Sequence, residues 1–308
     1  MNRVRSSLLV FGFGLVCCAS AVHADYEEGV AQYEQGHFAS AVYAWRESAE
    51  AGNARSQYRL ARMYEAGRGV PRNQDRASKW YSLSADSGYA PAQARMAERY
   101  MRGRGVERDE QVAARWYRRA AEQGDADAQF RLGLLYLEGR EVDVDEAQAA
   151  RWIKAAAEQG VVSAQNNLGT LYENGRGVTR DPARALDWYE KAAKSGDALA
   201  QNNLGAMYAR GRGVERNYAW AVFWFAMAAQ NGNDEAAGNI EASLSHLREA
   251  SVDVGKARVR AGRSTDYDVL TTRERGATLY VLGETEGWSQ VYLPEQQRLG
   301  WIASKLLD

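Results

Sequence analysis

A period of 36 residues runs through most of this 308-residue chain and limits what it can fold into. Tryptophan marks the period, at Trp45, Trp80, Trp116, Trp152, Trp188 and Trp224, and every step after the first is 36 residues. Two glycine columns and a tyrosine column keep the same phase, at Gly52 to Gly232, Gly67 to Gly211 and Tyr64 to Tyr208. Such self-similarity indicates an array of stacked repeats that share one continuous core.

Each unit reads as two helices. In the unit that starts at Gly124, Ala128, Leu132 and Tyr136 share one helical face, and Gly139 is placed to end the helix with a left-handed cap. A column of good N-cap residues precedes the second helix: Asn73, Asp109, Asp145, Asp181 and Asn217. The tryptophan column is expected to complete the core. We predict an all-α superhelical solenoid over residues 25–250, with a leading helix at 26–35, an extra second helix at 38–50 and an extra first helix at 233–245.

The best-formed unit carries a family pattern. Residues 164–178 read AQNNLGTLYENGRGV, followed by Asp181, Ala185, Trp188 and Tyr189. This resembles the Sel-1-like repeat, a relative of the tetratricopeptide repeat, and the resemblance covers residues 38–245 with five full units. It implies a TPR-like superhelix whose concave groove binds proteins. One unit departs from the pattern, because Glu141 replaces the second glycine of the Gly-Arg-Gly loop, and the geometry of that loop is expected to differ.

The periodicity changes after His246. Residues 278–282 and 288–293 alternate like strands, and Gly276, Gly287 and Gly300 punctuate this part of the chain. Five short strands in about fifty residues predict a small all-β barrel. We place this domain at residues 254–308, after a linker at 252–256. Residues 258–264 together with Gly287-Trp288 and Gly300-Trp301 are similar to a bacterial SH3 domain. Members of that family bind cell-wall peptide or glycan, or only mediate contacts.

The first 24 residues read as a signal peptide. A basic start precedes an apolar run, and Val22-His23-Ala24 offers small residues at the expected cleavage positions. We therefore predict export to the periplasm or beyond. Cleavage after Ala24 removes both cysteines, and the mature chain is expected to have no transmembrane segment.

Catalysis is not indicated. The mature chain has no thiol, and His37 and His246 are too far apart in sequence to suggest a metal site. The recurring Gly-Arg-Gly-Val follows a helix and not a strand, so it reads as a turn and not as a phosphate loop. The formal net charge of -1 does not favour nucleic acid. We predict no catalytic, cofactor-binding or metal-binding residues, and a protein that is not an enzyme.

The predicted groove contains the candidate protein-binding residues. In the third unit, Phe130, Leu134 and Leu137 lie opposite the buried face of their helix, beside Met101 and flanked by Asn166 and Asn202. An exposed apolar patch of this kind marks a partner site, unless curvature or a loop covers it. A bordering column of Arg59, Arg95 and Arg131 continues as Asn167 and Asn203. These arginines either meet carboxylates of a partner or form a solvated flank paired to nearby acids.

In the predicted barrel, the candidate ligand residues are Tyr267, Trp288 and Tyr292, whereas Trp301 and Val291 are expected in the core. The leading hypothesis is an exported cell-envelope adaptor that binds envelope proteins in the groove, with a barrel that binds peptidoglycan or a second partner. The alternative is a regulatory subunit of a peptidoglycan-processing enzyme. An enzyme in its own right is the third and least favoured hypothesis.

Overall fold

The computed structural model describes residues 26–139 and 142–308. The predicted signal peptide, its cleavage site and the departure at Glu141 lie outside the described residues. The chain divides into two compact units between Asp145 and Glu146. We call them the first unit and the second unit, and describe each by itself.

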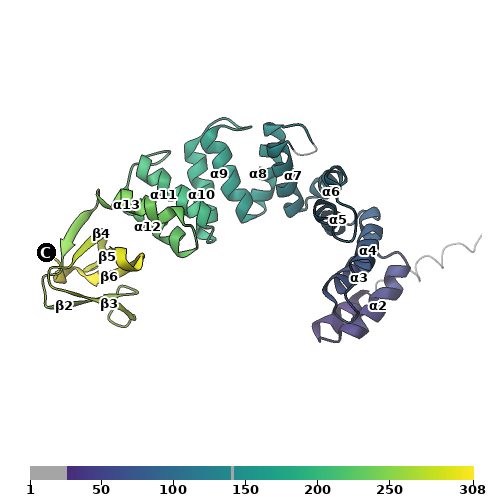
Figure 1. Ribbon diagram of the computed structural model, residues 1–308, viewed down its shortest axis with the longest axis horizontal. Helices are drawn as coiled ribbons and strands as arrows, with labels where there is room; N and C mark the ends of the chain where they lie inside the picture. The colour runs from purple at the N-terminus through teal and green to yellow at the C-terminus, as the bar shows by residue number, and fades with distance from the viewer. Residues whose placement is uncertain (1–25, 140–141) are drawn as a thin grey trace, which may run out of the picture. The chain divides into compact units, whose positions relative to one another are not determined.

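Both units are built from helix pairs, and the first also contains the leading helix at residues 26–34 (Figure 1). The first unit holds α2 (Phe38–Glu50), α3 (Ala54–Ala66), α4 (Gln74–Asp86), α5 (Ala90–Arg102), α6 (Glu110–Glu122) and α7 (Ala126–Glu138). The second unit holds α8 (Glu146–Glu158), α9 (Val162–Asn174), α10 (Pro182–Lys194), α11 (Ala198–Arg210), α12 (Tyr218–Gln230) and α13 (Glu235–Leu244). We call α3, α5, α7, α9 and α11 the A helices, and α4, α6, α8, α10 and α12 the B helices. The predicted solenoid and its extra helices at both ends are confirmed.

The capping column performs its predicted role. The side-chain oxygens of Asn73, Asp109, Asp181 and Asn217 accept the backbone N–H three residues on, at 2.8–3.1 Å. These bonds satisfy donors that the first helical turn leaves unpaired. A second column went unnoticed in the sequence: Asn53, Asp125 and Asp197 cap A helices in the same way.

The second glycine of the Gly-Arg-Gly loop is required by close packing as well as by its positive φ. At Gly105, with φ of +63°, an added Cβ would lie 2.6 Å from the carbonyl oxygen of Gln74 in the preceding B helix. Gly69 and Gly213 approach the preceding helix in the same manner. Each of these loops is therefore pressed against the neighbouring repeat.

The core differs from the prediction at the tryptophan column. Trp45 is buried, but Trp80, Trp116, Trp152, Trp188 and Trp224 are only half-buried. The buried side chain is the next one along the B helix: Tyr81, Tyr117, Ile153, Tyr189 and Phe225. The expectation that these five tryptophans fill the core was wrong. Part of each of these five side chains remains accessible, and basic side chains lie over Trp116, Trp152 and Trp188.

A glutamine column joins each A helix to the B helix before it. The Nε2 groups of Gln57, Gln93, Gln129, Gln165 and Gln201 each donate to an alanine carbonyl eight residues earlier, at 3.0–3.3 Å. The amide oxygens of Gln93 and Gln201 are satisfied as well, because Gln123 donates to Gln93 and Asn231 donates to Gln201. The Oε1 atoms of Gln57 and Gln165 are buried and have no hydrogen-bond partner among the described residues.

The C-terminal part is one antiparallel sheet. Its strands are β1 (Arg248–Ser251), β2 (Lys256–Arg260), β3 (Val269–Glu274), β4 (Thr278–Thr285), β5 (Trp288–Leu293) and β6 (Arg298–Ala303). They are ordered β1-β4-β5-β6-β2-β3. This sheet is consistent with the SH3-like domain that the sequence predicts. β1 lies upstream of the predicted domain boundary at residue 254. Val252, which we expected in a linker, is buried in the core of the sheet.

The sheet packs against the last helices of the solenoid within the second unit (Figure 1). Tyr292 is only 3% exposed and packs in a cluster that includes Val222, Phe225 and Ile240 from α12 and α13. α12 is unusually apolar, reading YAWAVFWFAMAAQ, so it can bury one side against α11 and another against the sheet. The sheet therefore covers part of the last helix pair, as a terminal repeat requires.

Candidate functional site

The first unit contains a small pocket rich in arginine, which we call the arginine pocket. It has a volume of about 210 Å³ and is lined by Tyr33, Trp45, Arg59, Arg62, Met63, Glu65, Ala66, Arg68 and Arg95. Most of these residues come from α3, with aromatic rings from the leading helix and α2 and one guanidinium from α5. The pocket thus combines aromatic and aliphatic walls with four positive charges and one carboxylate.

The carboxylate of Glu65 is held by its neighbours. Its Oε1 accepts from Arg99 at 2.8 Å, and its Oε2 accepts from the Tyr81 hydroxyl at 2.9 Å and from Arg95 at 3.4 Å. Arg99 is only 2% exposed and also donates to Ser78 and Gln74. Burial raises the pKa of Tyr81, and the charge of Glu65 adds to this. The tyrosine is therefore a fixed hydrogen-bond donor at neutral pH.

The arginines around Glu65 are not equally engaged. Arg95 also donates to Glu98 at 2.6 Å, so its predicted pairing with nearby acids is present. Arg68 donates to the Tyr33 hydroxyl. Arg59 has its guanidinium 5.8 Å from the centre of the Trp45 ring, and neither it nor the exposed Arg62 forms a hydrogen bond or ion pair within the described residues. Two guanidinium groups at the pocket are thus available to a ligand.

The predicted apolar patch is half-buried. Phe130, Leu134 and Leu137 on α7, and Met101 on α5, are each intermediate in exposure, where we expected open solvent exposure for the three α7 residues. Arg131 beside them is exposed, as predicted. These residues belong to the first unit, whereas Asn166 and Asn202 belong to the second. That they form one hot spot remains a prediction.

The second unit has asparagines where the first has arginines. Asn203 donates to the Oδ1 atom of Asn166 at 3.1 Å, and Asn239 donates to that of Asn202 at 2.9 Å. The ladder links α9, α11 and α13, and Asn166 is buried. These amides are therefore engaged with one another, which favours a role in joining repeats over one in binding a peptide.

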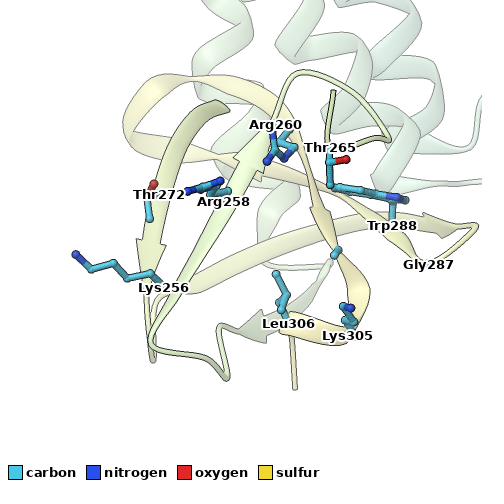
Figure 2. Close-up of a pocket in the computed structure, with 10 residues that line it drawn as sticks. Lys256, Arg258, Arg260, Thr265, Thr272, Gly287, Trp288, Lys305 and Leu306 are labelled. Atoms are coloured by element: carbon cyan, nitrogen blue, oxygen red, sulfur yellow. The ribbon is translucent and has the colours of Figure 1, made fainter. Parts of the chain in front are cut away.

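A larger pocket lies on the C-terminal sheet, and we call it the sheet pocket (Figure 2). It has a volume of about 880 Å³ and is lined by Lys256, Arg258, Arg260, Thr265, Thr272, Gly287, Trp288, Ala303, Lys305 and Leu306. None of these residues is acidic. Arg260 donates to the carbonyl of Tyr267 at 2.7 Å, and Lys256 lies 3.9 Å from Glu274, which is itself exposed. The side chains of Arg258 and Lys305 form no hydrogen bond or ion pair with the part of the chain that the structure describes. The volume falls in the range of small-molecule sites, about 300–1,000 Å³.

Comparisons with known proteins agree with this architecture. The family model described as Sel1 repeat matches residues 54–89, 90–125, 126–161, 162–197 and 198–233. The chain belongs to the Sel1 repeat family. The model described as bacterial SH3 domain matches residues 255–308. The comparison with curated proteins gave no match.

Two solved structures extend the comparison. A Sel1 repeat protein from Oxalobacter formigenes is 32% identical with a TM-score of 0.65, over 69% of this chain and 88% of that one. The protein c5321, a protective antigen of uropathogenic Escherichia coli with an SLR fold, is 35% identical with a TM-score of 0.68. That match covers 75% of this chain and 51% of the antigen. Sel1 repeat proteins are typically interaction scaffolds without enzymatic activity.

In this Sel1 repeat protein the three predicted ligand residues of the SH3-like domain, Trp288, Tyr267 and Tyr292, do not line one common pocket. Trp288 lines the sheet pocket, and its role in binding a ligand remains a prediction. Tyr267 is 54% exposed in the loop after β2, but it does not line the pocket. Tyr292 was wrongly predicted as a ligand residue, because its ring is buried against α12 and α13. Trp301 is half-buried, whereas Val291 is in the core as expected.

Sequence reasoning missed the cations of the sheet pocket. Lys256, Arg258 and Arg260 alternate along β2, which places their side chains on one face of the sheet, and this spacing is visible in the sequence. Lys305 comes from the far end of the chain, so only the fold reveals it. Across residues 26–139 and 142–308 there is no cluster of metal-ligating side chains and no helix long and apolar enough to cross a membrane.

Proposed function

We propose that this Sel1 repeat protein is an exported cell-envelope adaptor. In this proposal the repeats bind a protein partner, and the SH3-like domain binds peptidoglycan through the sheet pocket. The observation that carries it is the set of four cationic side chains around Trp288, with no acidic residue in the lining. Peptidoglycan presents carboxylates on its stem peptides beside apolar methyl groups, which suit guanidinium groups next to an aromatic ring.

The family gives independent support for the scaffold half of the proposal. Sel1 repeats suggest protein–protein interaction, and bacterial SH3 domains include members that bind cell-wall material. The basic, apolar and small-residue pattern of residues 1–24 is the reason for proposing export. Intact-mass measurement of protein purified from the envelope is expected to give a chain that begins at Asp25. A chain that retains Met1 would contradict export by this route.

The wall-binding half is tested by sedimentation with purified peptidoglycan sacculi. Residues 25–308 are expected to pellet with sacculi, and Arg258→Glu is expected to reduce the bound fraction at least fivefold. Arg298→Glu on β6 makes the same charge change at an exposed position outside the pocket and serves as the control. No sedimentation of the wild-type chain, or equal losses in both variants, would contradict a specific site at the sheet pocket.

A further inference from the structure

The arginine pocket has an excess of positive charge, although Arg95 is paired with Glu98 and Arg68 donates to Tyr33. Arg59, Arg62, Arg68 and Arg95 line it, and the single carboxylate in the lining, Glu65, is already held by Arg99 and Arg95. Arg59 and Arg62 have no acidic partner within the described residues. Like charges gathered on one small surface repel one another, so this cluster costs stability unless a ligand neutralises it.

The size of the pocket limits the ligand. About 210 Å³ is less than drug-sized ligands require, and it suits one side chain of a larger partner. Trp45, Met63 and Ala66 offer apolar contact for a methylene stem, and the guanidinium groups offer planar donors for a carboxylate. A glutamate side chain has this combination of a short apolar stem and a carboxylate head.

The fold also holds the pocket in place. Arg99 is buried and joins Glu65 to Ser78 and Gln74, so α3, α4 and α5 are linked beneath the surface. Glu98 and Glu65 in turn orient Arg95, which lines the same pocket as Arg59 and Arg62. Such a site is prepared before a ligand arrives, which lowers the entropic cost of binding.

We infer that the arginine pocket binds a glutamate-containing acidic segment of the protein partner. This inference rests on the proposed adaptor function and names the chemistry of its partner. The side chain of the partner would enter between Arg59 and Arg62, with the neighbouring acidic residues along the surface of α3 and α5.

The test uses residues 25–308 and two fluorescein-labelled peptides, capped at both ends, that alternate glycine with glutamate or with glutamine. Fluorescence anisotropy is expected to show at least tenfold tighter binding of the glutamate peptide. Arg62→Glu is expected to weaken that binding at least tenfold, because it reverses a charge at the mouth of the pocket. Arg59→Glu provides a second variant at the same site. Arg115→Glu, an exposed position on α6 without a hydrogen bond or ion pair in the described ranges, should change binding less than twofold.

Three results would overturn the inference. They are equal affinity for the two peptides, equal losses in the Arg62 and Arg115 variants, and displacement of the glutamate peptide by tripolyphosphate at concentrations far below those of unlabelled glutamate peptide. The last result would indicate a phosphate site. Arg62→Glu should still pellet with sacculi like the wild type. Loss of sacculus binding by the wild-type chain, with peptide binding intact, would remove the proposed function and leave this inference standing.

Discussion

The arginine pocket and the corresponding surface of the second unit, three repeats further along, are built on the same hydrogen bond. In the first unit the Tyr81 hydroxyl donates to Glu65 at 2.9 Å, and in the second the Tyr189 hydroxyl donates to Glu173 at 3.1 Å. Both tyrosines are buried on a B helix, and both glutamates lie near the end of an A helix. The same pair therefore occurs on two surfaces, whereas the other three repeats have Met101, Leu137 and Ala209 in place of the glutamate.

Around that pair the two surfaces differ in chemistry. Arg59, Arg62, Arg95 and Arg99 of the first unit correspond to Asn167, Thr170, Asn203 and Met207 of the second. The partners of Arg99 change with it, because Gln74 and Ser78 correspond to Pro182 and Leu186. A buried polar group is tolerated only when it is hydrogen-bonded, which explains why these positions differ together. The comparison teaches that a Sel1 repeat can exchange its surface chemistry without changing its backbone.

The largest expected effect is at the buried arginine. Arg99→Met gives the first unit the side chain of the second and leaves Ser78, Gln74 and Glu65 without their shared donor. We expect a loss of about 3 kcal/mol of stability in urea denaturation. Arg102→Met, which breaks only an exposed ion pair with Glu98, should cost less than about 1 kcal/mol.

A triple variant tests the same network further, because it gives the first unit the residues that surround Met207 in the second. Adding Gln74→Pro and Ser78→Leu to Arg99→Met replaces two of the orphaned groups with apolar ones and should recover part of the loss. If Arg99→Met alone leaves stability unchanged, the network around Glu65 does not support the fold.

Loss of the tyrosine hydroxyl is expected to lower stability more in the second unit, at Tyr189, than in the first, at Tyr81. Tyr189→Phe removes the donor to Glu173 and also leaves the hydroxyl of Thr170 without the partner it has at 3.0 Å. When Tyr81 is replaced, the carboxylate of Glu65 keeps its ion pairs with two arginines, whereas among the described residues Glu173 keeps an ion pair only with Arg212. We expect losses of about 2 kcal/mol for Tyr189→Phe and about 1 kcal/mol for Tyr81→Phe in thermal melts. The reverse order would contradict this account of the two networks.

The raised pKa values of Tyr81 and Tyr189 predict that the folded chain is less stable at alkaline pH. Burial raises their pKa above the ordinary value near 10, so the folded state keeps protons that the unfolded state releases. Their contribution is complete below about pH 10 and declines above it, by about 1 kcal/mol for each tyrosine at pH 11. Absorbance at 295 nm should show that the Tyr189→Phe and Tyr81→Phe variants each have one fewer tyrosine that ionises only when the chain unfolds. Full titration of all tyrosines in the folded state near pH 10 would refute this.

The smallest effect concerns the glutamine column, which leaves one orphaned oxygen in each unit. Ser87 and Ser195 occupy the positions from which Gln123 and Asn231 reach the preceding repeat, but the serine side chain is too short and bonds within its own helix. Ser87→Gln and Ser195→Gln are expected to satisfy Gln57 and Gln165 and to stabilise the chain by about 0.5–1 kcal/mol each. Ser82→Gln, elsewhere on the α4 surface, should have no such effect.

The sequence was sufficient for the repeat architecture because its signals are local and recur. Capping residues, glycine turns and the alanine columns each act within one or two helices, and the structure confirms them. The half-buried tryptophans were misjudged because residue type suggests burial, whereas the packing of each B helix against the A helices beside it decides which side chain is buried. Tyr292 was misjudged because its burial depends on the docking of the sheet against α12, a contact between segments about seventy residues apart.

The candidate sites were only partly predictable for the same reason. The arginine column was visible as a repeat feature, but the hydrogen bonds that engage Arg95 and leave Arg59 without an acidic partner depend on three helices meeting. Lys305 joins Arg258 at the sheet pocket through the fold of the last strands. Both pockets thus arise from contacts across the fold that no single segment specifies.

The most direct test of the adaptor account is whether the chain carries an acidic peptide to the cell wall. Sacculi are sedimented with the labelled glutamate peptide, with and without residues 25–308. The account predicts that the peptide pellets only when the chain is present. It also predicts that Arg62→Glu pellets without the peptide and that Arg258→Glu leaves both in the supernatant. The account would be contradicted if the wild-type chain pelleted and bound the peptide in solution but never carried it into the pellet, because the two sites would then not act together.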